Sequence, residues 1–189
     1  MGSGQYTRWA GRGCSDGSAA SLDSRRRPTH PSAVAEAKTR IPSLDALPDF
    51  VGVALGPSDW VRVDQARIDA FADATEDRQW IHVDVERAKS ESPWQGTIAH
   101  GYLTLSLAPG LLVQLLSLDG WSTVVNSGIE KLRFQAPVRS GSRVRLQAEI
   151  SNVRRMPGGG VRVAFGLRIE AEGESKPALT ATANYVYLP

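Results

Sequence analysis

The sequence predicts an α+β fold in which an antiparallel sheet packs on one buried helix. Two observations lead to this prediction. Residues 98–118 form the longest apolar run of the chain, with apolar side chains on every face, as in a buried helix. Beyond Gly120 the pattern changes to strands separated by turn residues, at 123–127, 128–134, 143–153, 161–171 and 178–187. One face of such a meander must be buried, and a single apolar helix can cover it.

The apolar run itself is expected to be wholly buried. His100, Ser106 and Pro109 interrupt it, so it is not a candidate membrane span. Pro109 and Gly110 fall inside it, and we expect a kink there or two helices placed end to end. Gly101 lies near its start, where a backbone without a side chain lets another segment or a ligand come close.

Shorter elements precede this run. Ser43 is a suitable N-cap for a helix over residues 43–56, which Gly56 can end. The alternation over 58–63 predicts a strand. Asp64 then caps an amphipathic helix with the sequence DQARIDAFADAT.

A polar segment follows this amphipathic helix. Residues 76–80 carry no periodicity and are expected to form a loop that leads to His82. Asp84 caps a further short helix, VERAKSES, and residues 93–96 form a turn before the apolar run.

Charge divides the chain into two parts. Residues 1–40 contain seven Arg and Lys against three Asp and Glu, whereas residues 41–189 contain fifteen against seventeen. The first part is rich in Gly, Ser, Arg and Ala and has no apolar periodicity. We therefore expect a disordered basic tail over 1–40 and a single folded domain over 41–189. The basic charge belongs to the tail, so it does not predict nucleic-acid binding by the domain.

The tail leaves several readings open. It lacks the apolar core of a secretory signal, and its Arg and Ser content is compatible with a transit peptide, although its acidic residues and prolines weaken that reading. An expression remnant or an over-extended reading frame is the alternative. Cys14 is the single cysteine, which excludes an intramolecular disulfide and a cysteine metal cluster. This suits a reducing cytoplasm, and the scattered histidines predict no metal site.

Two separated motifs carry a family resemblance. FADATEDRQWIHVDVERA followed by GTIAHGYLTLSL resembles the MaoC-like dehydratases, the (R)-specific enoyl-CoA hydratases. Asp77 matches the catalytic Asp of that family and His82 its catalytic His, and Gly101 matches the glycine at the start of the helix. Glu76 stands where Gly is usual, and Gln79-Trp80 stand where Asn-Pro is usual. With VNSGIEKLRFQAPVRSGSRV, the Trp form resembles the branch that contains nodulation protein N-like members.

The resemblance covers the chain from about residue 43 to its end, and it implies a fold and a reaction. The implied fold is the hot-dog fold, a sheet wrapped around the central apolar helix. Such domains pair into homodimers through sheet edges, with active sites near the interface. The implied reaction is the reversible syn addition of water to a trans-2-enoyl thioester, which gives an (R)-3-hydroxyacyl thioester. The implied partner is an acyl-CoA or acyl-carrier thioester, and no cofactor is needed.

The residue types suit this chemistry. An Asp and a His can hold one water between them and share its proton traffic, and an imidazole is suited to that task near neutral pH. The start of a helix presents free N–H groups to a developing oxyanion. Asp77 and His82 are therefore the candidate catalytic residues, and the Gly101 N–H is the candidate oxyanion donor.

Other readings of these residues remain. An acyl-CoA thioesterase shares the hot-dog fold and can employ an Asp and an oxyanion helix. A non-catalytic acyl-thioester-binding protein is a third reading, which the departures at Glu76, Gln79 and Trp80 keep open. Taken singly, Asp77 is compatible with a turn residue and His82 with a structural histidine. His100 lies beside Gly101 and is a possible site residue, but we expect it to have a structural role, bonding a carbonyl in the loop before the apolar helix.

Overall fold

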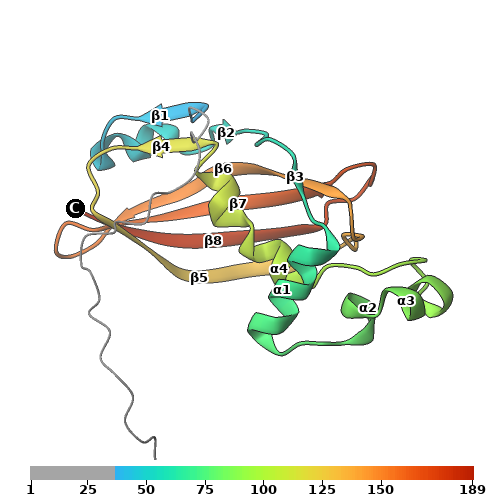
Figure 1. The fold of residues 1–189 in the computed structure, drawn as a ribbon. Helices are drawn as coiled ribbons and strands as arrows, with labels where there is room; N and C mark the ends of the chain where they lie inside the picture. Colours follow the sequence, from blue (N-terminus) through green and yellow to red (C-terminus); the bar gives the residue numbers. More distant parts are fainter. Residues whose placement is uncertain (1–36) are drawn as a thin grey trace, which may run out of the picture. The chain divides into compact units, whose positions relative to one another are not determined.

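The computed structural model describes residues 37–189, and its main sheet is antiparallel with six strands in the part described (Figure 1). Neighbouring strands follow the order β2-β6-β7-β8-β5, and β3 also pairs with β6. The long strands are formed by the alternating segments that the sequence predicts. The strands of this sheet are β2 (Ala54–Leu55), β3 (Val61–Arg62), β5 (Thr123–Phe134), β6 (Arg143–Arg155), β7 (Val161–Ala171) and β8 (Leu179–Leu188).

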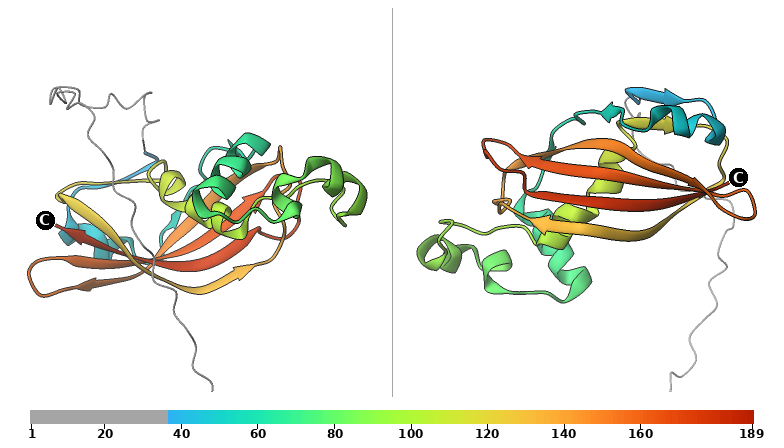
Figure 2. Two further views of the ribbon diagram at one scale, coloured as in Figure 1. Left: turned by 60° about the horizontal axis from the view of Figure 1, so that its bottom comes forward. Right: turned by 180° about the vertical axis from the view of Figure 1, so that it is seen from behind.

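The central apolar segment forms two short helices, α4 (Gly101–Ser106) and α5 (Ala108–Leu112), on one face of this sheet (Figure 2). Every second residue of β7, from Val161 to Ala171, is buried toward them, and Phe165 is fully buried. Alternation with period two places these side chains on one face of the strand. The predicted α+β class and hot-dog arrangement are confirmed.

Three further helices follow one another in the chain before α4. They are α1 (Gln65–Thr75), α2 (Trp80–Val83) and α3 (Val85–Glu91). The predicted caps are confirmed, because the Asp64 side chain accepts from the Arg67 N–H and the Asp84 side chain from the Arg87 N–H, each at 3.0 Å. These bonds satisfy N–H groups that have no partner within the helix.

The apolar run differs from its prediction in two ways. It is not wholly buried, since Tyr102 is 66% and Val113 55% exposed. The two helices meet at Leu107 rather than at Pro109-Gly110, because Pro109 is accommodated in the first turn of α5, where a missing N–H costs nothing. The end of the run is β4 (Leu116–Leu118), which pairs in parallel with β1 (Thr39–Ile41) as a separate two-stranded sheet.

The segment before α1 also differs. Ser43 is the predicted N-cap, and its hydroxyl accepts from the Ala46 N–H at 3.3 Å. The helix it caps is a 3-10 helix, η1 (Leu44–Phe50), so the prediction that it extends to Gly56 was wrong. The chain turns into strand β2 instead. The strand predicted over 58–63 is reduced to the two residues of β3.

The ordered elements begin slightly earlier than the predicted domain boundary, since β1 includes Thr39 and Arg40. Residues 1–36 of the predicted tail, with Cys14, lie outside the described residues. Within residues 37–189, no helix combines the length and the apolar character needed to cross a bilayer.

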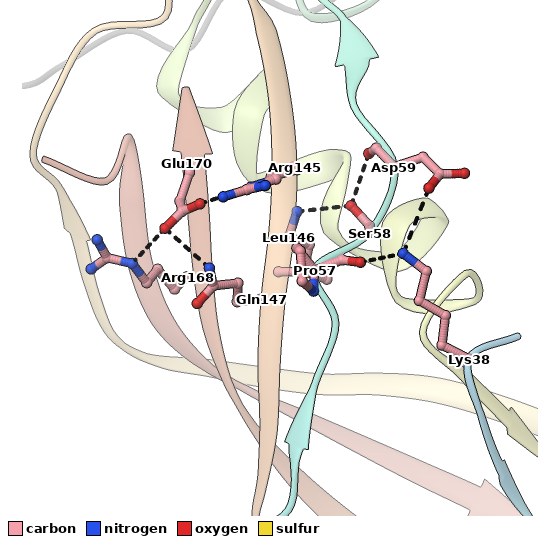
Figure 3. A network of polar contacts seen from close by, with 9 residues as sticks. All are labelled: Lys38, Pro57, Ser58, Asp59, Arg145, Leu146, Gln147, Arg168 and Glu170. Carbon is pink, nitrogen blue, oxygen red and sulfur yellow. Dashed lines mark hydrogen bonds and ion pairs between the residues drawn. The ribbon is translucent and has the colours of Figure 1, made fainter. Parts of the chain in front are cut away.

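The face of the sheet away from the helices carries a polar network (Figure 3). The Glu170 carboxylate accepts from Arg145 at 2.9 Å, from Arg168 at 3.1 Å and from Gln147 at 3.2 Å. Burial alone would raise the pKa of Glu170, but the hydrogen bonds and charges of Arg145 and Arg168 outweigh it and hold the pKa below its usual value. Glu170 therefore stays charged on this face at neutral pH.

Candidate active site

A cavity of about 390 Å³ opens between the start of α4 and the segment that follows β5. Its lining is mainly apolar, and its polar lining residues include His82. Further lining residues are Trp94, Ile98, Gly101, Tyr102 and Phe134. Two of the three predicted site residues, His82 and Gly101, thus line one cavity.

His82 is held in place by its own backbone and by its ring. Its carbonyl accepts from the Gln65 side chain of α1 at 2.8 Å, and its Nδ1 lies 2.7 Å from the carbonyl oxygen of Ile98. A carbonyl can only accept, so Nδ1 carries the proton. The neutral ring then presents the lone pair of Nε2, which makes His82 a base rather than a donor at that atom.

The surroundings of His82 keep its ring neutral. Burial lowers the pKa of His82, and a positive charge on His100 would act in the same direction. The hydrogen bond to Ile98 and the charge of Asp77 oppose this, but the net direction is downward from 6.5. A base of this kind is available at neutral pH.

Asp77 lies in the loop between α1 and α2, and its side chain is exposed, whereas that of His82 is buried. Potential ligand atoms of Asp77, His82 and His100 lie within 4.8 Å of one another. At such a separation one water molecule can bridge a carboxylate and an imidazole. The structure therefore brings the two predicted catalytic side chains together, although Asp77 is not in the cavity lining.

The departure at Glu76 has a local explanation. Glu76 caps the C-terminus of α1 with φ of +62°, in the left-handed region that favours glycine. A glutamate there costs roughly 1 kcal/mol relative to glycine. Its side chain is exposed and, among residues 37–189, forms no hydrogen bond or ion pair, as is usual for a residue that faces solvent.

His100 touches the site more closely than the sequence predicts. Its Nε2 donates to the backbone carbonyl of Asp77 at 2.9 Å. This carbonyl lies in the loop between α1 and α2, and not, as we expected, in the loop directly before the apolar helix. The ring of His100 also stacks on that of His82, with centroids 3.8 Å apart and planes 29° apart. In the sequence, the only signal for the contact between His100 and His82 is that His100 precedes Gly101 in the motif.

Gly101 begins α4, and its side-chain position is filled by another residue. A Cβ atom there would lie 2.9 to 3.0 Å from ring atoms of Phe134. His100, at the N-cap, gives no side-chain cap, so N–H groups of the first turn are left for another acceptor. Phe134, which the sequence does not single out, lines the cavity together with Tyr102. The two rings pack edge to face, with centroids 6.0 Å apart.

Trp80 and Trp94 have different positions. Trp80 lies outside the cavity lining, and the Arg87 guanidinium lies 4.3 Å from its ring centroid. Trp94, which the sequence places only in a turn, forms part of the cavity wall. A tryptophan in a turn carries no pattern that would reveal this role.

Asp77, His82 and His100 together offer potential metal ligands. Nitrogen and oxygen ligands lie roughly 2.0–2.2 Å from a bound zinc ion. Two such ligands are then at most about 4.4 Å apart, and the potential ligand atoms of the three residues lie within 4.8 Å of one another. Nδ1 of His82 and Nε2 of His100 are engaged with backbone carbonyls, so each ring offers one nitrogen to a further ligand. The same spacing accommodates a bridging water.

Comparison with known proteins gives a consistent family. Residues 49–167 match the family described as MaoC like domain. The chain is 43% identical over 146 residues to 3-hydroxyacyl-thioester dehydratase Z of Mycobacterium tuberculosis. The aligned region covers 77% of this chain and 96% of that protein. The chain is also 44% identical over 140 residues to nodulation protein N of Rhizobium leguminosarum bv. viciae, covering 74% and 87%.

A solved structure shares the architecture. The (R)-hydratase from A. caviae involved in PHA biosynthesis superimposes with a TM-score of 0.54 and 29% sequence identity, over 71% of this chain and 98% of that one. The similarity therefore covers most of this chain and nearly all of that one.

Proposed function

The chain belongs to the MaoC-like dehydratase family, and from this premise we propose that it catalyses the reversible hydration of trans-2-enoyl thioesters to (R)-3-hydroxyacyl thioesters. The homologue of M. tuberculosis is named a 3-hydroxyacyl-thioester dehydratase, and the A. caviae structure is an (R)-hydratase. The substrate is an acyl-CoA or acyl-carrier thioester in this proposal.

In the proposed reaction, one water donates to the Asp77 carboxylate and to Nε2 of His82. As the water oxygen bonds to the β-carbon, Asp77 and His82 together accept a proton from the water. They deliver a proton to the α-carbon on the same face of the substrate. The carbon–carbon double bond is lost, and no electron donor or acceptor is needed. In the intermediate, negative charge on the thioester oxygen is met by the Gly101 N–H at the start of α4.

The observation that carries this proposal is the hydrogen bond from Nδ1 of His82 to Ile98. It fixes the tautomer with an accepting Nε2, and it does so in a cavity that also contains Gly101. A general base needs both a suitable pKa and a fixed orientation, and this contact supplies the second.

The cavity also suits the substrate class. Small-molecule sites commonly measure about 300–1,000 Å³ and are mainly apolar with a few polar groups. The cavity beside His82 is about 390 Å³, with an apolar wall that includes Phe134 and Trp94. An acyl chain can pack against such an apolar wall, and the thioester group would then lie beside His82.

Incubation of the full chain with crotonyl-CoA tests this function. We expect loss of the enoyl absorbance without release of free thiol. Thiol release would instead identify a thioesterase. Binding without turnover over a series of chain lengths would identify a non-catalytic acyl-thioester-binding protein.

We also propose that the chain forms a homodimer through strand β5. Among the described strands β5 pairs only with β8, so its other edge is open. Val124 and Val125 are exposed on this strand, and an open apolar edge favours pairing with another chain. A location in the cytoplasm remains a prediction, based on the single Cys14.

A further inference from the structure

His100 has one ring nitrogen without a partner in a buried place. The side chain is 3% exposed, and Nδ1 is the one buried side-chain nitrogen or oxygen without a hydrogen bond among residues 37–189. Because Nε2 donates to a carbonyl, Nδ1 of the neutral ring carries a lone pair rather than a proton. Burying such a group without a partner is unfavourable, so its presence calls for a compensating role.

The contacts of His100 lead to each of the three proposed site residues. Nε2 holds the backbone of Asp77 at 2.9 Å, and the ring face lies against His82 with centroids 3.8 Å apart. The carbonyl of His100 belongs to the peptide unit that carries the Gly101 N–H. One residue thus joins the loop, the base and the oxyanion donor.

His100 is also held at its ring and at its backbone. Phe71 of α1 lies 5.1 Å from the ring of His100, measured between the centroids of the two rings. The Thr104 N–H and hydroxyl both lie within hydrogen-bond distance of the backbone carbonyl of His100, at 3.1 and 3.3 Å. A residue held in this way can transmit its position to the residues it touches.

From these contacts we propose that His100 is the positioning residue of the site, and that it acts by holding the Asp77 loop against His82. This inference rests on the proposed hydratase function. His100 does not touch the water or the substrate in this proposal. Its hydrogen bond to Asp77 fixes the distance between the carboxylate and the imidazole.

Substitution at position 100 separates the two contacts. In His100→Gln the amide nitrogen takes the place of Nε2 and can still donate to Asp77, whereas the ring is lost. His100→Phe keeps an aromatic face for His82 but removes the donor. His100→Asn has an amide too short to reach the Asp77 carbonyl, and it serves in parallel in case the phenyl ring is not accommodated.

Ser58→Ala provides a matched control. Ser58 is 4% exposed, and its hydroxyl accepts from the N–H of Leu146 in strand β6 at 2.9 Å (Figure 3). It thus also ties one backbone segment to another from a buried position. It does not line the cavity, so its loss should lower the midpoint of thermal unfolding and leave kcat unchanged.

The test is kcat and KM for hydration of crotonyl-CoA by folded full-length variants. We expect kcat of His100→Phe and His100→Asn to fall roughly 30- to 100-fold with KM within about threefold, because misplaced groups slow the chemical step. His100→Gln should stay within about fivefold of the wild-type kcat.

The positioning role is overturned if the Phe and Asn variants keep wild-type kcat, if Gln is no better than they are, or if the loss lies in KM. It is also overturned if activity falls only in proportion to the unfolded fraction, as for Ser58→Ala. Failure of the wild-type chain to hydrate any enoyl thioester would instead overturn the proposed function.

Discussion

Two hydrogen bonds join the segment that contains His82 to the segment that contains Ile98. The ring Nδ1 of His82 lies 2.7 Å from the Ile98 carbonyl, and the Ile98 N–H donates to the carbonyl of the adjacent Ile81 at 3.0 Å. The short helix α2 is therefore fastened to the segment that leads into α4. This arrangement fixes the base and the start of the oxyanion helix relative to each other.

The pH dependence of activity follows from His82. Burial holds the pKa of His82 below 6.5, and the neutral ring is the active form. We expect kcat/KM to be constant near neutral pH and to fall as the pH drops through this lowered pKa, so the midpoint of the acid limb lies below 6.5. A pH profile measured with crotonyl-CoA gives this midpoint.

Asp77→Asn provides the control for that assignment. The Asp77 charge raises the pKa of His82, so its removal should move the acid limb of the residual activity to lower pH. An acid limb with a midpoint above 6.5, or one that moves upward in Asp77→Asn, would show that another group governs the profile.

Gly101 and Phe134 should be coupled. A Cβ at position 101 would lie 2.9 to 3.0 Å from the Phe134 ring, so Gly101→Ala must displace the ring or the start of α4. We expect Gly101→Ala to lower kcat about tenfold or more in the wild-type background. In a Phe134→Ala background the same change should cost less than about threefold, because the space is free.

The four proteins of this cycle are compared by kcat for one enoyl-CoA substrate. Equal costs of Gly101→Ala in both backgrounds would mean that contact with Phe134 is not what requires glycine at this position. The N–H of residue 101 is present in every variant, so the cycle isolates the steric effect.

Local signals predicted much of this fold. The caps at Asp64 and Asp84 depend on residues three positions away, and both are found as predicted. The long strands follow from alternation, although the segments 123–127 and 128–134 form one strand with an irregularity between Asn126 and Gly128. The alternation of side chains cannot distinguish one strand with such a bulge from two separate strands.

Features set by distant contacts were not predictable. The end of the apolar run becomes β4 because β1 pairs with it, and two of the three residues of β1 lie in the segment predicted as tail. The bond from His100 to Asp77 and the packing of Phe134 on Gly101 also join remote segments. The motif placed Asp77 and His82 correctly in one region, but the contacts that position them required the structure.

Glu170 should make stability sensitive to acid. Because its pKa is lowered in the folded state, its contribution is present above the unfolded value of about 4.3 and is lost as the pH falls through the folded value. We expect Glu170→Gln to lower the free energy of unfolding by about 1 kcal/mol at pH 7. Denaturant titrations should show that this difference narrows below about pH 4.

Glu149→Gln is the matched control for Glu170. Glu149 is exposed on the neighbouring strand β6 and forms no ion pair within residues 37–189. Its substitution should change stability by less than about 0.5 kcal/mol at either pH. An equal effect of the two substitutions would contradict the role of the Arg145 and Arg168 contacts.

The proposed dimer predicts a sensitive position on β5. Val125 is 48% exposed near the open edge, and Val125→Lys would place a charge in the pairing region. We expect the molar mass from light scattering to change from that of a dimer to that of a monomer. Val53→Lys, at an exposed valine outside β5, should leave the dimer intact, and a monomeric wild-type chain would contradict the proposal.

The most direct test of the shared water is the hydration rate of Asp77→Asn, His82→Ala and the double variant on crotonyl-CoA, each confirmed as folded. We predict that each single variant lowers kcat about 10²-fold or more, and that the double variant is at most about tenfold below the slower single variant, because the two residues act as a unit. Wild-type rates in both folded single variants would contradict the assignment of Asp77 and His82.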